Sequence, residues 1–166
     1  MSEYQLTREI IALSFAQTWT EAKLEWEIAE VYRAGQPDAC LCGHFPIIEV
    51  CVLVNKATRR EAKVGNCCAK KFLGLRPDDI LRALERVKRN PKKSLNAEAI
   101  AYAFKMGWIT EWERRFYFDI EGMRGLTDGQ ISKRTEINKN LFKKMRAHEY
   151  ASGRRESGKV RARGAR

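Results

Sequence analysis

The chain has 166 residues and a formal net charge of +11, and this length allows one domain or two small ones. No apolar run reaches the roughly 20 residues that span a bilayer, and the polar N-terminus MSEYQLTREI differs from a secretory leader, so the sequence argues against membrane and secreted proteins. The odd number of cysteines, five, indicates reduced thiols in a cytosol rather than a disulfide framework, so we expect a cytoplasmic protein.

The positive charge is distributed unevenly along the chain. Residues 1–39 carry a net charge of −4, whereas residues 40–75, 76–150 and 151–166 carry +4, +6 and +5. A basic surface attracts polyanions, of which nucleic acid is the commonest, so we expect a nucleic-acid partner, DNA more than RNA. The alternative is that the positive charge only keeps the protein soluble.

The sequence predicts an α+β protein that is mostly α overall, in which a small zinc finger packs with several α-helices. Breaks in composition suggest four segments: an N-terminal helical segment (1–38), a zinc-binding finger (39–75), a helical region (76–150) and a disordered basic tail (151–166).

In the first segment, residues 6–15 are apolar enough for a short helix or a strand, and the pattern does not decide between them. Thr18 and Glu21 have the spacing of a capping box. The apolar residues that follow recur at helical spacing as far as Gly35, so we expect an amphipathic helix here. Trp26 lies on its apolar side and should pack in the core.

The finger is predicted from a hairpin followed by a short helix. Residues 47–54 are β-branched and apolar and predict a strand, residues 55–59 a turn, and residues 60–64 a return strand. A short helix should then carry Cys68 in its first turn and end at Gly74. A knuckle, a hairpin and a cysteine-bearing helix together form a treble-clef-like arrangement.

The helical region should contain four helices with recognisable ends. Pro77 opens the first, Ser94 or Asn96 caps the second, and capping boxes at Thr110 and Thr127 begin the third and fourth. The predicted ranges are 78–89, 96–104, 111–120 and 127–150.

All five cysteines lie between residues 40 and 68, which indicates a structural metal site. Zn²⁺ prefers four soft or borderline ligands in a tetrahedron, and chains supply them in closely spaced pairs. Cys40 and Cys42 fit a knuckle whose tight turn Gly43 permits, and Cys68 is the best ligand on the helix. Cys51 is our first choice as fourth ligand. The alternates are His44 and Cys67.

The segments CLCGHFPIIEVCVLVNK and VGNCCAKKFLGL resemble a group of small treble-clef-like zinc-binding proteins from bacteriophages and other mobile elements, most of them uncharacterised. These share C-x-C-G-H, a strand that ends in Asn, G-N-x-C and K-F, and weaker similarity extends the match over most of residues 19–142. The basic extension after Tyr150 departs from them. The resemblance implies a zinc-finger fold and a mobile-element origin, hence a host-cell cytosol, but no particular activity. The positions that match are Cys40, Cys42, Gly43, His44, Asn55, Gly65, Asn66, Cys68 and Phe72.

We do not expect an enzyme, because the sequence has no phosphate-binding Gly-rich loop and no Ser/His/Asp spacing, and lysines follow Cys68 where a treble-clef nuclease needs metal ligands. The sequence instead favours a zinc-stabilised nucleic-acid-binding accessory protein of a phage or mobile element. The residues expected to contact phosphates are Arg59, Arg60, Lys63, Lys70 and Lys71 in the finger and Arg154, Arg155, Lys159, Arg161, Arg163 and Arg166 in the tail.

Two other functions stay open at this point. The protein could be an inhibitor or adaptor that binds a host polymerase, nuclease or defence complex through its acidic first segment (Glu21, Glu25, Glu27 and Glu30). It could also be a helix-turn-helix regulator built from residues 97–104 and 111–120, although the acidic and aromatic second helix would make a poor recognition face.

Overall fold

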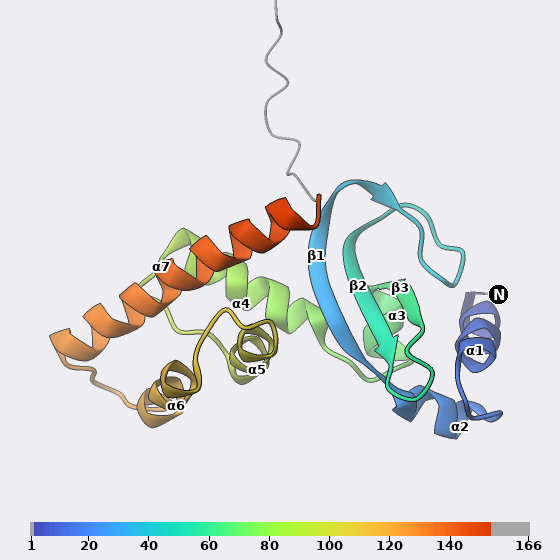
Figure 1. Ribbon diagram of the computed structural model, residues 1–166, viewed down its shortest axis with the longest axis horizontal. Coiled ribbons are helices and arrows are strands. Elements are labelled where there is room, and N and C mark those ends of the chain that lie inside the picture. Colours follow the sequence, from blue (N-terminus) through green and yellow to red (C-terminus); the bar gives the residue numbers. More distant parts are fainter. Residues whose placement is uncertain (1, 154–166) are drawn as a thin grey trace, which may run out of the picture.

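The computed structural model describes residues 2–153 and shows an α+β protein in which just over half of these residues are helical. One antiparallel sheet has the strand order β1-β2-β3 (Figure 1). In chain order the elements are α1 (Ser2–Leu13), α2 (Trp19–Ala22), a 3-10 turn (Lys23–Glu25), β1 (Trp26–Asp38), β2 (Ile47–Asn55), β3 (Glu61–Gly65), α3 (Asn66–Lys71), α4 (Pro77–Arg89), α5 (Ala97–Lys105), α6 (Glu111–Ile120) and α7 (Asp128–Ala151).

The prediction of a long first amphipathic helix is wrong, because β1 occupies most of its range. Only α2 and the 3-10 turn are helical there. The capping box is also wrong, since the Thr18 hydroxyl donates to the Glu21 carboxylate (2.8 Å) and caps no backbone amide. Trp26 does pack in the core, with 4% of its surface exposed, but it does so as the first residue of a strand.

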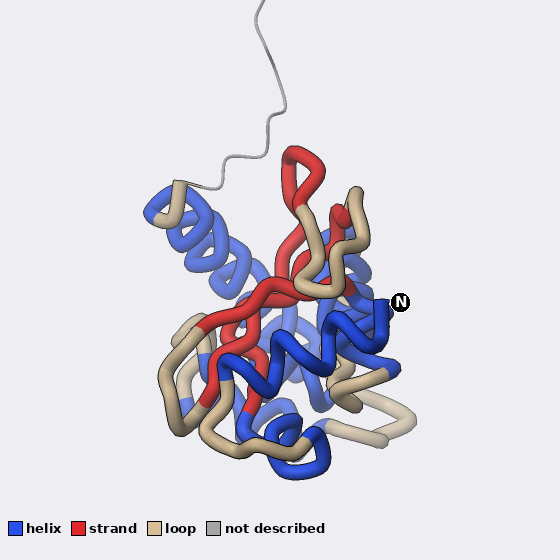
Figure 2. Tube along the Cα trace, turned by 90° about the vertical axis from the view of Figure 1, so that its right-hand side faces the viewer, coloured by secondary structure: helices blue, strands red, loops and turns tan. Residues whose placement is uncertain are grey.

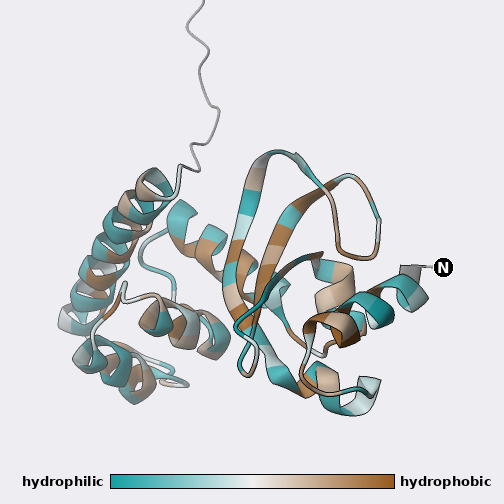
Figure 3. Cartoon of the chain, turned by 45° about the vertical axis from the view of Figure 1, so that its right-hand side comes forward, coloured by the Kyte–Doolittle hydropathy of each residue, from teal (hydrophilic) through white to brown (hydrophobic). Residues whose placement is uncertain are grey.

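This segment forms a strand and not a helix because it pairs with β2 in the folded protein. β2 contains five consecutive apolar residues, Val50 to Val54, and most of the strand is buried, so it needs a paired strand on both edges. β3 pairs with one edge and β1 with the other, from Trp26 opposite Asn55 to Asp38 opposite Ile47. Figure 3 shows the hydrophobic colouring of most of β2.

The hairpin and the helices of the second half match the prediction closely. β2, β3 and α3 lie where the sequence places them, and the undecided segment near the N-terminus is the helix α1. The Asn96 side chain caps α5, and capping boxes at Thr110 and Thr127 begin α6 and α7. Each signal is local to one turn of the chain, which is why sequence alone is sufficient to find it.

One continuous core joins the sheet to the helices on both sides. Figure 2 shows α1 passing in front of the strands, and Leu6 and Ile10 of this helix are fully buried. On the other side, the Val31 amide of β1 donates to the hydroxyl of Tyr102 on α5 (3.0 Å). The predicted segments 1–38, 39–75 and 76–150 therefore all contribute residues to one core.

A buried asparagine attaches α7 to the loop before α5. The Asn138 side chain is fully buried and donates to the carbonyls of Pro91 (2.7 Å) and Lys93 (2.9 Å). Its oxygen accepts from the Tyr117 hydroxyl of α6. Because all these groups are satisfied, the network fixes the basic loop 90–93 beside α7. None of the described helices is long and apolar enough to cross a membrane.

Candidate metal centre and charged surfaces

The loop between β1 and β2 presents two cysteines in one tight turn. The Gly43 amide donates to the Cys40 carbonyl (2.8 Å), and the Cys40 amide donates to the His44 carbonyl (2.9 Å). Gly43 has a φ of +86°, and a Cβ at this position would come within 2.9 Å of the Gln5 side chain. Glycine is therefore favoured here by the backbone conformation, whereas the Gln5 side-chain end could move aside for a Cβ.

The first turn of α3 supplies the third thiol. Cys68 lies in that turn with 7% of its surface exposed, while Cys40 and Cys42 are 5% and 4% exposed. The sulfur atoms of these three residues all lie within 4.8 Å of one another. We call this cluster the cysteine triad. It is the one group of potential metal ligands of this kind among residues 2–153.

Backbone amides stabilise negative charge on the triad. The Gly65 amide donates to the Cys40 sulfur (3.3 Å). Burial raises the pKa of both Cys40 and Cys68. Burial also acts to raise the pKa of Cys42, but hydrogen bonds from the His44 amide and the other two thiols outweigh it and lower this pKa. The triad thus favours a thiolate at Cys42, the form of cysteine that binds metal cations.

The donor set fits a metal ion. Three thiols with mutually close sulfurs, little solvent contact and amide donors around them have the chemistry of a thiolate metal site. The sequence prediction of Cys40, Cys42 and Cys68 as close neighbours is therefore confirmed, and the triad could hold a metal ion.

The structure does not bring Cys51, the preferred fourth ligand, into the triad. Cys51 is fully buried in the middle of β2, where it is paired with Val31 on one side and Val64 on the other. Burial raises its pKa to about 12, so this thiol stays protonated and behaves as a small apolar core residue.

The two alternates lie closer to the site. His44 and Cys67 are both exposed and line the same hollow as the triad. Glu49 lines it too, but its carboxylate accepts from Arg33 (2.7 Å) and from the Asn66 side chain. The fourth position of a tetrahedral ion could therefore be filled from His44 or Cys67 without disturbing the core.

Most of the basic finger residues predicted to contact phosphates have partners inside the protein. Lys63 pairs with Asp38 (2.9 Å) and Lys70 with Asp78 (3.3 Å). The other contacts join Arg60 to the Ala12 carbonyl (3.2 Å) and Lys71 to the Phe72 ring (5.0 Å), while Arg59 makes no such contact with the described residues. The predicted tail residues, Arg154 to Arg166, lie outside the described residues.

A second basic surface, which sequence reasoning did not single out, lies along α7. We call it the α7 basic surface; it comprises Lys92, Lys93, Lys139, Lys143, Lys144 and Arg146, all exposed. Within the part of the chain that the structure describes, no ion pair or hydrogen bond engages these six side-chain charges. The two loop lysines join it because Asn138 and Arg134 of α7 bind the loop carbonyls. In the sequence, this surface could have been predicted from the basic residues on the polar face of the last helix.

The acidic residues considered for protein binding are also engaged internally. Glu25 accepts from two backbone amides and Asn55, Glu27 pairs with Lys105 (3.1 Å), and Glu30 faces His148 (3.3 Å). They lie on a turn and a strand rather than on one helix face. The structure therefore offers no continuous acidic helix surface in this segment.

Comparisons of the chain with models of protein families, with curated proteins and with solved structures found no match. A functional assignment must accordingly rest on the residues themselves.

Proposed function

We propose that this protein is a zinc-stabilised nucleic-acid-binding accessory protein of a phage or mobile element, and not an enzyme. The cysteine triad, with His44 as fourth ligand, would hold Zn²⁺ in a treble-clef-like centre made of the knuckle, the β2–β3 hairpin and α3. Zn²⁺ is proposed because thiolate-rich closed sites favour it over harder cations. When bound, the ion would connect the loop before β2 to the start of α3.

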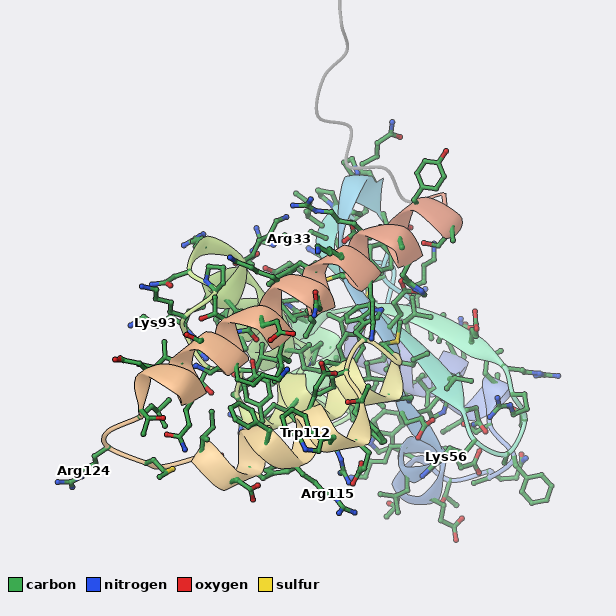
Figure 4. All side chains as sticks on the ribbon, turned by 60° about the vertical axis from the view of Figure 1, so that its left-hand side comes forward. Arg33, Lys56, Lys93, Trp112, Arg115 and Arg124 are labelled. Atoms are coloured by element: carbon green, nitrogen blue, oxygen red, sulfur yellow. The ribbon has the colours of Figure 1, made fainter. Side chains whose placement is uncertain are left out.

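The observation that carries the binding role is the α7 basic surface. Free lysine and arginine charges attract phosphates, whereas charges already paired with carboxylates gain less from doing so. Figure 4 shows α7 crossing the front of the molecule with Lys93 beside it. The surface is formed by a helix and a loop bound to it, so its helical charges, from Lys139 to Arg146, keep a fixed spacing along about two turns.

The test compares two charge reversals of equal size on different surfaces. Lys143→Glu with Lys144→Glu changes the α7 basic surface, and Lys56→Glu with Arg59→Glu changes the hairpin turn. Binding of labelled DNA is measured by fluorescence polarisation over a salt series. We expect the α7 double variant to lose about tenfold or more in affinity and about two units of salt slope, and the hairpin variant to lose clearly less.

Two outcomes would overturn the proposal. One is a metal-loaded wild-type protein that binds neither DNA nor RNA at low salt. The other is equal loss in both double variants, which would show that net charge and not this surface governs binding. A protein partner that stays bound after nuclease treatment, in the absence of nucleic-acid binding, would instead favour an inhibitor or adaptor.

A further inference from the structure

A tryptophan beside α7 has more than half of its surface exposed. Trp112, on α6, is 58% exposed, whereas Trp26 and Trp108 are 4% and 6% exposed. Trp19 is partly buried against the core. Trp112 is thus the most exposed of the four tryptophans, and its indole face is open to another ring.

The Trp112 ring is held in a defined position. It stacks on Phe116 of the same helix, with ring centroids 5.7 Å apart and planes inclined by 16°. Phe116 is itself partly buried against the core, so it supports the indole from the inner side. The ring therefore offers a preformed flat surface that loses little conformational freedom when another ring packs on it.

A cationic group lies next to the Trp112 ring. The Lys133 ammonium is 5.4 Å from the centroid of Trp112 and also pairs with Glu136 (3.2 Å). Lys133 belongs to α7, the helix that carries most of the α7 basic surface. In Figure 4, Trp112 and Lys93 lie on either side of this helix. An aromatic platform and a row of free cations thus border the same element.

We propose that the α7 basic surface and Trp112 together bind single-stranded nucleic acid, with a base stacked on the Trp112 indole and the Lys133 ammonium turned from the ring to a neighbouring phosphate. The proposal rests on the nucleic-acid-binding function above and specifies its substrate. Single strands are favoured because their bases can expose a face for stacking, whereas the faces of duplex bases are covered by their neighbours.

A second aromatic group on α6 provides a matched control. Phe118 is 43% exposed, but its ring and that of Phe104 flank the Arg114 guanidinium, which lies 5.9 Å and 4.7 Å from the two centroids. Arg114 is fixed in turn by Glu111 (2.8 Å). This cluster is internally satisfied, so Phe118→Leu removes an exposed ring from the same helix without removing the proposed platform.

The experiment measures Kd for oligo(dT), oligo(U) and a DNA duplex of equal length with wild type, Trp112→Leu, Trp112→Phe and Phe118→Leu. We expect wild type to bind a single strand more tightly than the duplex. Trp112→Leu should weaken single-strand binding about tenfold, Trp112→Phe should retain most of it, and Phe118→Leu should resemble wild type. Quenching of tryptophan fluorescence by the oligonucleotide should fall sharply in Trp112→Phe, since Trp26 and Trp108 are buried and Trp19 is partly buried.

The outcomes separate this inference from the function on which it rests. If no nucleic acid binds, the proposed function itself is lost. If the duplex binds as tightly as either single strand, or if Trp112→Leu matches Phe118→Leu while melting normally, the single-strand inference is overturned and the proposed function stands. A preference between oligo(dT) and oligo(U), which differ in the sugar and in the base methyl group, supports the inference in either direction.

Discussion

The carboxylate of Glu25 accepts a hydrogen bond from the side-chain amide of Asn55 at 2.7 Å and joins the turn before β1 to the end of β2. Asn55 is fully buried, and its oxygen accepts from the amides of Ala57 and Thr58 (2.8 and 2.9 Å). One side chain therefore closes the hairpin turn and binds the preceding segment. This accounts for an Asn at the end of the strand in physical terms, since neither Asp nor Leu could make both sets of contacts.

Asn55→Ala should be strongly destabilising. The substitution removes the acceptor of two turn amides and one donor to the Glu25 carboxylate, and each hydrogen bond contributes about 0.5–1.5 kcal/mol net. We expect the free energy of unfolding in urea to fall by about 2–3 kcal/mol. Asn140→Ala, on the surface of α7, should change it by less than about 0.5 kcal/mol. Equal effects would show that the Asn55 network does not stabilise the fold.

Glu25 should make stability depend on pH in a defined direction. The Asn55 hydrogen bond, followed by that of the Phe15 amide, lowers the pKa of Glu25 below its ordinary value of 4.5. A carboxyl with a lowered folded-state pKa contributes stability above that ordinary value and loses it as the pH falls through the folded pKa. Glu25→Gln should therefore be less stable than wild type near neutral pH.

The difference between wild type and Glu25→Gln should shrink as the pH is lowered below 4.5. Urea midpoints at several pH values measure it, and because the metal site is common to both proteins, acid release of the metal cancels in the comparison. Glu61→Gln removes the same charge from an exposed position with no ion pair among the described residues. If the stability difference between wild type and Glu25→Gln stayed constant with pH, it would contradict the lowered pKa of Glu25.

The elements that sequence predicts correctly are those whose signals are short. The hairpin, α3 and the capped helices are each specified by residues within one or two turns of chain, such as Thr110 with Glu113. β1 is different, because its pairing with β2 is broken by register shifts between Ile28 and Glu30 and between Arg33 and Asp38. Such irregularities remove the alternation that marks a strand, so helical spacing dominates the pattern.

The same distinction applies to the metal centre. Cys40 and Cys42 are adjacent in a turn that Gly43 makes visible in the sequence, and Cys68 follows from the start of a helix. Whether Cys51 points toward that cluster depends on which face of the sheet it occupies. That face is set by the register in which β2 pairs with β1 and β3. Spacing alone could therefore identify the three members of the triad but not a fourth candidate ligand.

Substitutions of the triad should separate metal ligands from the other thiols. Cys42→Ser and Cys68→Ser should lose stoichiometric Zn²⁺ and lower Tm by roughly 10 °C or more, because metal-binding free energy contributes to folding. Cys67→Ser should keep both the metal and the Tm. Cys51→Ala should keep the metal but lose about 1 kcal/mol through poorer packing. Metal analysis and thermal melting together test this, and metal retention in Cys68→Ser would refute the triad.

His44 is the fourth ligand that we expect from the geometry. Its backbone is already fixed at the triad, since its carbonyl accepts from the Cys40 amide (2.9 Å), and its exposed side chain lines the same hollow as the three cysteines. Cys67 is part of α3 and is directed about 100° away from Cys68 around the helix axis, so its sulfur is less well placed for the same ion. His44→Ala should therefore weaken metal affinity, and Cys67→Ser should not. Competition with a chelator measures the affinity, and the thiolate-to-metal absorption of the Co²⁺-substituted protein counts the sulfur ligands. Three thiolates in wild type and in Cys67→Ser are expected, whereas a fourth that disappears in Cys67→Ser would assign the position to Cys67 instead.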